Sequence, residues 1–294
     1  RAMLDLMTQA RLGVAARAIG IAEAAYRQAR TYASERVQFG APIIEQPLVK
    51  SMLTLMALDI QSSRALLYRT CAMIDMTAAI EAYLASDRND PGVDRAALQE
   101  ELERNTQLIR FFTPLCKYYS TEVSNRVTRA GIQIHGGIGY MAESPAGHYH
   151  SDSIITTIYE GTSEIQASFA LREMSKGALF TALEQTRADL EHLDDRFPEE
   201  AKLVRDGIGA ITASLPGLME DPRYALLNAK RVCDMVIDVV VAAELLFQAE
   251  VVPTKYELAA SFIRRNMLMV DMHAKRIQSG DVSRLERYNR ILGL

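Results

Sequence analysis

Glu160 stands in the segment 159–162, Tyr-Glu-Gly-Thr, where a carboxylate precedes a residue that has no side chain. A carboxylate that is removed from water can accept a proton as a general base. Gly161 permits the backbone to approach a ligand closely. Taken alone, such a segment is more often a surface carboxylate before a helix that begins with Thr162 or Ser163 as its cap.

Two further segments carry groups suited to binding a phosphate. Arg36 opens residues 36–40, Arg-Val-Gln-Phe-Gly, and a guanidinium can donate two parallel hydrogen bonds to a phosphate. Gly136 and Gly137 lie within residues 133–140, Gln-Ile-His-Gly-Gly-Ile-Gly-Tyr, and let backbone N–H groups come close to an anion. Each has a plainer interpretation: an arginine that interacts with a helix dipole, and a glycine pair that ends a helix.

The spacing of apolar residues predicts the helices that must position these segments. The stripe from Val49 to Leu67 recurs at steps of three, four and seven residues, as in a bundle seam, and a similar stripe runs from Ile109 to Ala130. Gly and Pro mark the interruptions between helices. The expected helices are Ala2–Glu35, Pro47–Leu84, Asp94–Gly131 and Ser163–Gly177, with a loop at 38–46, a polar break at 86–91, and a glycine-rich segment at 135–147 that is followed by a short irregular stretch.

Beyond about Phe180, three Pro-containing breaks separate four more helical stretches. They lie at residues 197–198, 215–217 and 252–253. We therefore expect an all-α chain made of a four-helix bundle at residues 1–178 and a second, smaller helical bundle at residues 179–294.

Composition limits the classes of function. Net charge is −4, which gives no electrostatic reason to expect nucleic acid as a partner. Three widely spaced cysteines indicate neither a disulfide framework nor a metal site, and they favour a reducing, cytoplasmic compartment. No apolar run is long enough to span a membrane. We propose no metal at His135, His148 and His150.

In combination and in this order, the three segments resemble the acyl-CoA dehydrogenase family over about residues 1–176. Residues 180–294 resemble, more weakly, a helical domain that one branch of the family carries after this part. The resemblance implies FAD as cofactor and an acyl-CoA substrate. It also implies removal of the α-proton as the β-hydride passes to FAD, which gives a trans-2-enoyl-CoA.

The resemblance also assigns roles to individual residues. Glu160 matches the catalytic base, and Tyr159 and Ile158 are expected to shield it from water. Some members place the base on the first helix, but that position is Ala10 here. Pro47 stands where the family usually has a glutamine that contacts FAD, so that contact is in doubt. The cofactor-binding residues implied are Arg36, Gln38, Gln133, Gly136, Gly137, Thr162 and Glu164, and the substrate residues are Arg11 and Gly161.

The family places an N-terminal helical domain and a β domain before this part, so we expect the chain alone to be inactive. The expected partners are an electron-transfer flavoprotein and further copies of the chain, as a homodimer or homotetramer. Two alternatives remain open. One is an acyl-CoA oxidase, and the other is a non-catalytic assembly or nucleic-acid-binding module that uses the basic C-terminal residues Arg264, Arg265, Lys275, Arg276, Arg284, Arg287 and Arg290.

Overall fold

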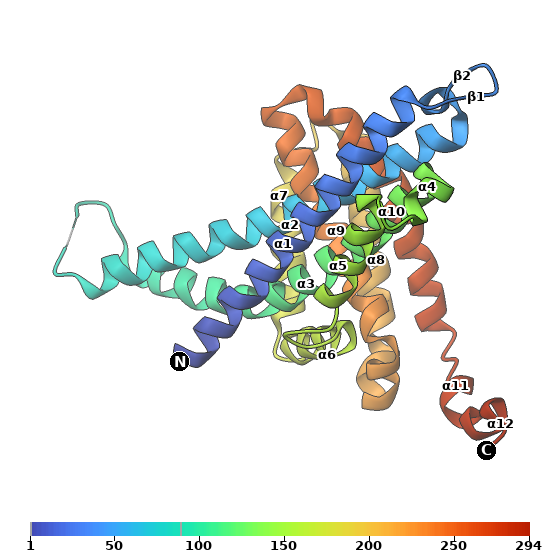
Figure 1. Ribbon diagram of the computed structural model, residues 1–294. Coiled ribbons are helices and arrows are strands. Elements are labelled where there is room, and N and C mark those ends of the chain that lie inside the picture. The colour runs from blue at the N-terminus through green and yellow to red at the C-terminus, as the bar shows by residue number, and fades with distance from the viewer. Residues whose placement is uncertain (1, 89) are drawn as a thin grey trace. The chain divides into compact units, whose positions relative to one another are not determined.

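The computed structural model describes residues 2–88 and 90–294 and shows two compact units (Figure 1). Residues 1–181 form unit 1 and residues 182–294 form unit 2. Helix α7 (Ala178–Glu191) contains the division between them. The domain boundary expected after residue 178 stays a prediction about separate folding units.

Unit 1 is built on three long helices, α1 (Ala2–Glu35), α2 (Pro47–Ala85) and α3 (Arg95–His135). The shorter α5 (Pro145–Thr156) and α6 (Ser163–Met174) complete it. Helix α3 packs against α1, α2, α5 and α6, and every residue from 111 to 120 is buried. A helix that is buried on all sides is the centre of its bundle, so α3 is the element from which the others are positioned.

Local sequence explains where these helices begin. The Asp94 side chain accepts hydrogen bonds from the backbone N–H groups of Ala96 and Ala97, which otherwise have no partner in the first turn of α3. Pro47 is the first residue of α2, where a missing N–H has no cost. Polar contacts then fix α2 against α3, with Arg126 Nε donating to Asp59 Oδ2 at 3.0 Å.

The segment after α3 is more helical than expected. Helix α4 (Gly137–Tyr140) and helix α5 lie where we expected glycine-rich and irregular chain. Ser144 caps α5 and Pro145 begins it, while Asn125 of α3 donates to the carbonyl of Ser153. Gly147 lies inside α5 without ending it, and a Cβ there would make only an ordinary contact, 3.5 Å, with the carbonyl oxygen of Gly139, so the packing does not require glycine at this position.

The connection between α1 and α2 contains a small hairpin, β1 (Val37–Gln38) paired with β2 (Ala41–Pro42), and the 3-10 helix η1 (Ile43–Glu45). The hairpin is the one sheet in the described part of the chain. The expected all-α class is therefore confirmed.

Unit 2 is formed around α8 (Pro198–Glu220), α9 (Pro222–Val251) and α10 (Tyr256–Gln278), which pack against one another. The expected break at residues 215–217 is wrong, because α8 continues through Pro216 to Glu220. Pro216 lies in the last two turns of α8. Its missing N–H leaves the carbonyl of Thr212 without its helical hydrogen bond, and few helical hydrogen bonds follow it. The unit also contains the 3-10 helix η2 (Pro253–Lys255) and the short α11 (Ser283–Glu286) and α12 (Tyr288–Leu292).

The three cysteines lie at different depths. Cys116 and Cys233 are fully buried, and burial raises the pKa of the Cys116 thiol to about 12. Cys71 is only partly buried.

Among the described residues, no helix combines the length and the hydropathy that crossing a membrane requires.

We predict that Gly207→Ala destabilises unit 2. A Cβ at Gly207 would lie 2.9 Å from Met267 Sδ and 3.1 Å from Val239 Cγ2, at the crossing of α8 with α9 and α10. Overpacking of this kind costs about 1–3 kcal/mol. The matched control is Gly209→Ala on the same helix, where a Cβ meets nothing within 4 Å and should leave stability unchanged or raise it by up to about 1 kcal/mol. Urea unfolding measures both, and equal midpoints would contradict the packing argument.

Candidate functional site

Glu160 lies in the loop between α5 and α6, and residues of α1, α3 and α6 surround this loop. Arg11 of α1 places its guanidinium carbon 4.9 Å from the ring centre of Phe169 on α6. Lys117 of the central helix α3 donates from Nζ to the carbonyl oxygen of Gly161 at 2.7 Å. The structure thus gathers Arg11, Glu160 and Gly161, which are separated in sequence.

The loop holds Glu160 in an uncommon backbone conformation. Glu160 has φ 58° and Gly161 has φ 100°. A left-handed residue other than glycine costs on the order of 1–3 kcal/mol, so contacts must hold it there. Gln166 of α6 supplies two of them, because its Nε2 donates to the carbonyls of Glu160 at 2.7 Å and Gly161 at 3.2 Å. A side chain at position 161 would lie 2.8 Å from that same Nε2, so the site requires glycine.

Two cations stand in the electrostatic field of Glu160. Burial lowers the pKa of Arg11, and the Glu160 carboxylate opposes that shift. Burial, assisted by the nearby Arg11 charge, lowers the pKa of Lys117 to about 8, while Glu122 and Glu160 act in the opposite direction. A proton acceptor beside two cations can stabilise a substrate on which negative charge develops.

The shielding expected for Glu160 is not present in this chain. Glu160 is exposed, Ile158 is 50% exposed, and the hydroxyl of Tyr159 accepts a hydrogen bond from Arg17 Nη1 at 3.2 Å. Ile158 is therefore turned toward solvent and Tyr159 toward α1, and neither covers the carboxylate of Glu160. Exclusion of water from Glu160 must come from groups outside these residues.

Thr162 caps α6, with its hydroxyl accepting from the backbone N–H of Ile165 at 3.5 Å. Glu164 is exposed in the first turn of α6. Both residues lie directly after the Glu160 loop, so they share its end of unit 1.

Arg36 and Gln38 lie on the exposed hairpin that follows α1. The turn of this hairpin contains two left-handed residues, Phe39 at φ 55° and Gly40 at φ 84°. Phe39 is 92% exposed. These side chains therefore face outward from the described chain, as groups that meet a ligand or another molecule do.

The segment around Gly136 lies at the end of α3, beside the end of α1. His135 stacks on Tyr32 of α1 with ring centres 4.5 Å apart, and its Nδ1 lies 2.7 Å from the carbonyl of Gly131. Gly136 has φ 62°, and Gln133, Gly136 and Gly137 are exposed. A groove of about 390 Å³ opens between the two helix ends, and its lining includes Tyr32, Glu35 and His135.

The predicted residues therefore form two groups and not one. Arg11, near Glu160, and Glu35, the last residue of α1, are 24 residues apart on one helix. At 1.5 Å per residue, this separates the two groups by about 36 Å. The first group contains Arg11, Glu160, Gly161, Thr162 and Glu164, and the second contains Arg36, Gln38, Gln133, Gly136 and Gly137.

Sequence reasoning missed Lys117 and Gln166. Both are fully buried, although lysine and glutamine are mostly surface residues. The available signal was the position of Lys117 within the apolar run around Phe112 and Cys116, where a solvated lysine is out of place.

The three histidines singled out in the sequence have protein partners of their own. His150 Nδ1 lies 3.0 Å from the Thr128 hydroxyl, and His148 Nε2 lies 3.1 Å from the carbonyl of Ala142. Within the described ranges, no group of three or more His, Cys, Asp or Glu side chains could hold a metal ion.

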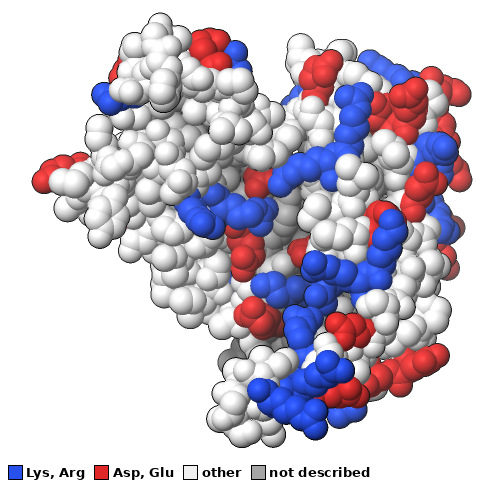
Figure 2. Space-filling view, turned by 90° about the vertical axis from the view of Figure 1, so that its right-hand side faces the viewer, with Lys and Arg blue, Asp and Glu red and all other residues white. Residues whose placement is uncertain are grey.

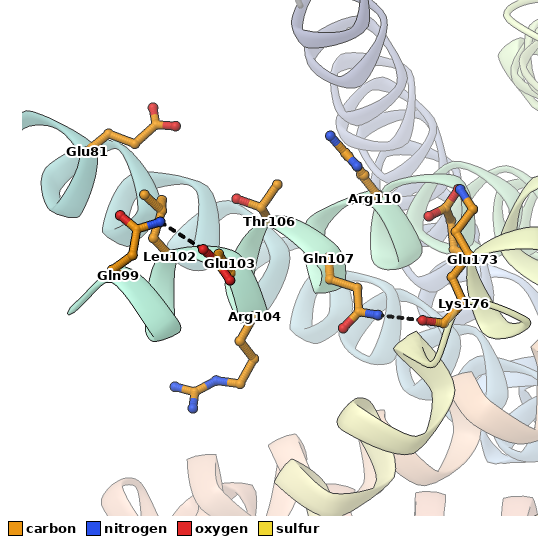
Figure 3. A pocket seen from close by; sticks show the side chains of 10 residues that line it. All are labelled: Glu81, Gln99, Leu102, Glu103, Arg104, Thr106, Gln107, Arg110, Glu173 and Lys176. Carbon is orange, nitrogen blue, oxygen red and sulfur yellow. Dashed lines mark hydrogen bonds and ion pairs between the residues drawn. The ribbon is translucent and has the colours of Figure 1, made fainter. Parts of the chain in front are cut away.

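A larger hollow of about 620 Å³ lies along the first half of α3, away from all predicted residues. Figure 3 shows Arg104 and Arg110 spread along α3 and Glu173 on α6, with these charged side chains pointing in different directions. Gln107 Nε2 donates to the carbonyl of Lys176 across one end, at 2.9 Å. No common point is left toward which these groups converge, so we assign no chemistry to the hollow.

Comparison with known proteins identifies the family. Residues 1–86 and 93–175 match the acyl-CoA dehydrogenase C-terminal domain. The match covers more than half of the chain, in the part that carries the Glu160 and Arg36 groups. The chain belongs to the acyl-CoA dehydrogenase family, and the resemblance inferred from the three segments is confirmed.

Among curated relatives, 3-methylmercaptopropionyl-CoA dehydrogenase of Ruegeria pomeroyi is 34% identical over 177 residues, 57% of this chain and 27% of that protein. Human mitochondrial short-chain specific acyl-CoA dehydrogenase is 32% identical over 163 residues, 55% of this chain and 32% of that protein. Acryloyl-CoA reductase (NADH) of Anaerotignum propionicum is 34% identical over 173 residues, 59% of this chain and 36% of that protein. The matched part is thus only about a third of these relatives' length.

Two solved structures share the fold over nearly the whole chain. Caenorhabditis elegans ACDH-11 in complex with C11-CoA has a TM-score of 0.74 at 18% identity and covers 96% of this chain and 47% of that one. Acyl-CoA dehydrogenase complexed with FAD from Bacillus anthracis has a TM-score of 0.72 at 21% identity and covers 94% and 49%. Both similarities extend into unit 2.

We predict a pH-dependent stability difference between the natural chain and Lys117→Met. The folded-state pKa of Lys117, about 8, lies below that of an unfolded lysine. Between these values the unfolded chain binds more protons, so stability rises with pH there and is constant below about pH 8, where lysine is protonated in both states. The variant lacks this contribution, so the difference in unfolding free energy should shift in favour of the natural chain by on the order of 1–3 kcal/mol from pH 7 to about 10.5.

Urea unfolding of both proteins at several pH values measures this shift. Titration of Cys116 affects both proteins alike and cancels in the difference. A pH-independent difference would show that the Lys117 ammonium is not desolvated.

Proposed function

We propose that this chain supplies the catalytic base and part of the FAD site of an acyl-CoA dehydrogenase. The proposed enzyme converts an acyl-CoA thioester to the trans-2-enoyl-CoA. The observation that carries the proposal is Glu160, held outward in a left-handed loop beside Arg11 and Lys117. Family membership and the acyl-CoA substrates named for the relatives support it.

In this proposal Glu160 accepts the α-proton of the substrate at its carboxylate. Gly161 leaves room for the thioester to approach the backbone, because no Cβ stands there. Arg11, which interacts electrostatically with Glu160, places a positive charge near the enolate that develops. The acyl chain and the rest of the protein would exclude water from the exposed carboxylate.

FAD, when bound, supplies the acceptor for the β-hydride. The residues present fit this cofactor. Arg36, Gln38 and Gln133 are exposed donors at one end of unit 1, and Gly136 adopts a left-handed conformation that brings the backbone to the surface. Such donors suit a pyrophosphate. Thr162 and Glu164 would contact a flavin at the Glu160 end.

The separation of about 36 Å along α1 bears on how many flavins are involved. An extended dinucleotide is shorter than this distance, so one FAD cannot reach both groups of the same chain. We therefore propose that Arg36, Gln38 and the Gln133–Gly137 segment serve the flavin of a second copy, within a homodimer or homotetramer. This assembly requires the outward-facing hairpin that the structure shows.

The chain covers about a third of the length of its curated relatives. The enzyme activity, the electron acceptor and the cellular compartment are therefore proposed for the whole protein. We propose an electron-transfer flavoprotein as acceptor and a cytoplasmic setting. An oxidase would be recognised by peroxide formation in the full-length protein.

The nucleic-acid-binding alternative finds less support. Figure 2 shows lysine and arginine side chains interspersed with aspartate and glutamate on the face in view. Lys275 pairs with Asp271 at 2.7 Å and Arg264 lies 3.7 Å from Glu200, so part of the basic C-terminal set is neutralised locally.

We predict that Glu160→Gln in the full-length protein retains FAD but loses turnover. The amide has nearly the same shape and cannot accept the α-proton, so kcat should fall by about 10²-fold or more. The measurement is flavin bleaching by an acyl-CoA panel in a stopped-flow instrument. Glu100→Gln, an exposed glutamate near the start of α3, is the control. Bleaching at the natural rate in Glu160→Gln would remove Glu160 from this role.

We predict that Arg36→Met weakens FAD binding in the full-length protein. Loss of a charged hydrogen bond worth about 1.5–3 kcal/mol lowers affinity by about 10- to 10²-fold. Fluorescence titration of the apoprotein with FAD measures it. Arg30→Met, an exposed arginine on the same helix, is the matched control. If both variants bind FAD with the same affinity, Arg36 does not contact the cofactor.

A further inference from the structure

The carbonyl oxygens on both sides of the Cα of Gly161 are held by buried donors. Lys117 Nζ lies 2.7 Å from the carbonyl oxygen of Gly161, and Gln166 Nε2 lies 2.7 Å from that of Glu160. Both donor side chains are 0% exposed. A trans peptide is planar, with C=O and N–H on opposite sides, so fixing a carbonyl fixes the orientation of its whole peptide unit.

The first of these peptide units contains the Cα of Glu160. The Cα–Cβ bond of Glu160 starts at a corner of this fixed unit, and the neighbouring backbone is in the left-handed region at φ 58°, so few directions are left for the side chain to leave the backbone. The donors thus limit where the carboxylate can reach, although neither donor is hydrogen-bonded to it.

Helix packing does not explain these two side chains. Lys117 lies in the part of α3 where all residues from 111 to 120 are buried, and an apolar residue would fill that place without desolvating an ammonium group. Gln166 leaves its Oε1 buried without a hydrogen-bond partner. We therefore attribute the presence of these two side chains to the hydrogen bonds that they donate to the loop.

A third contact ties the same loop to α3. The Ser163 hydroxyl donates to Oε1 of Glu122, five residues after Lys117 on the same helix. The loop is thus held from the central helix on both sides of Thr162, and from α6 by Gln166.

We propose that Lys117 and Gln166 are positioning residues, which clamp the peptide units flanking Gly161 and so aim the Glu160 carboxylate at the substrate. The proposal rests on the proposed function of Glu160. Neither residue touches the substrate, so their loss should change the rate of the reaction more than substrate binding.

The test uses Lys117→Met and Gln166→Leu in the full-length flavoprotein. Both variants keep approximate side-chain size and remove the donor. Thr70→Val is the control, because Thr70 is a fully buried hydroxyl that bonds Leu66 and Cys116 in the same bundle, away from the loop. Thr70→Val measures the effect of removing a buried polar group that does not contact the Glu160 loop.

Hydrogen exchange of the peptide spanning residues 158–164, measured without substrate, gives a readout independent of activity. Amides of this loop should exchange about 10-fold faster in Lys117→Met and Gln166→Leu than in Thr70→Val. With substrate, kcat should fall about 10- to 10²-fold, because a displaced base reacts more slowly. KM should stay within about threefold.

Loop exchange and kcat equal to those of Thr70→Val in both variants would overturn the proposal, even if Glu160→Gln abolishes turnover. If Glu160→Gln retains turnover instead, the proposed function fails, while the exchange data still report whether the loop is clamped. Should Lys117→Met fail to fold, Gln166→Leu decides alone, since it removes the donor to the Glu160 carbonyl.

Discussion

Complete burial of the middle of α3 is the constraint on which unit 1 depends. Because residues 111–120 have no solvent-facing side, a polar group there is costly unless it finds a partner within the protein, and the hydroxyls of Thr113 and Ser120 have none. Thr121 bonds back to the carbonyl of Lys117, Cys116 pairs with Thr70, and Lys117 reaches the Glu160 loop. The requirement to satisfy buried polar groups therefore links the centre of the bundle directly to the proposed catalytic base.

The two groups of predicted residues illustrate how a long helix organises a site. Helix α1 carries Arg11 to the Glu160 loop and, at its other end, Tyr32 to the stack with His135. One rigid element thus fixes the distance between the proposed base and the proposed phosphate-binding donors. This separation is the reason for proposing that the two groups serve flavins of different copies.

Local patterns predicted most of the fold. The Ala-rich, Pro-free stretch forms α1 with the expected bounds. The loop expected at residues 38–46 follows α1, and the polar break expected at 86–91 follows α2. Gly147 and Pro216 led to wrong predictions, because a glycine costs a capped helix only about 1 kcal/mol and Pro216 lies near the end of its helix. The apolar run around Lys117 signals that this lysine is buried, but its partner and the exposure of Glu160 could not be predicted, because both depend on which elements surround α3.

The different depths of the three cysteines have a practical consequence for spectroscopy. Cys116 and Cys233 are sealed in the core, and burial raises the pKa of both thiols, so neither forms the thiolate that reacts with alkylating reagents. Cys71 on α2 is partly accessible, although burial and the nearby Asp75 raise the pKa of its thiol. A maleimide dye applied at mildly alkaline pH should thus attach at one defined position of the natural sequence, without any engineered cysteine.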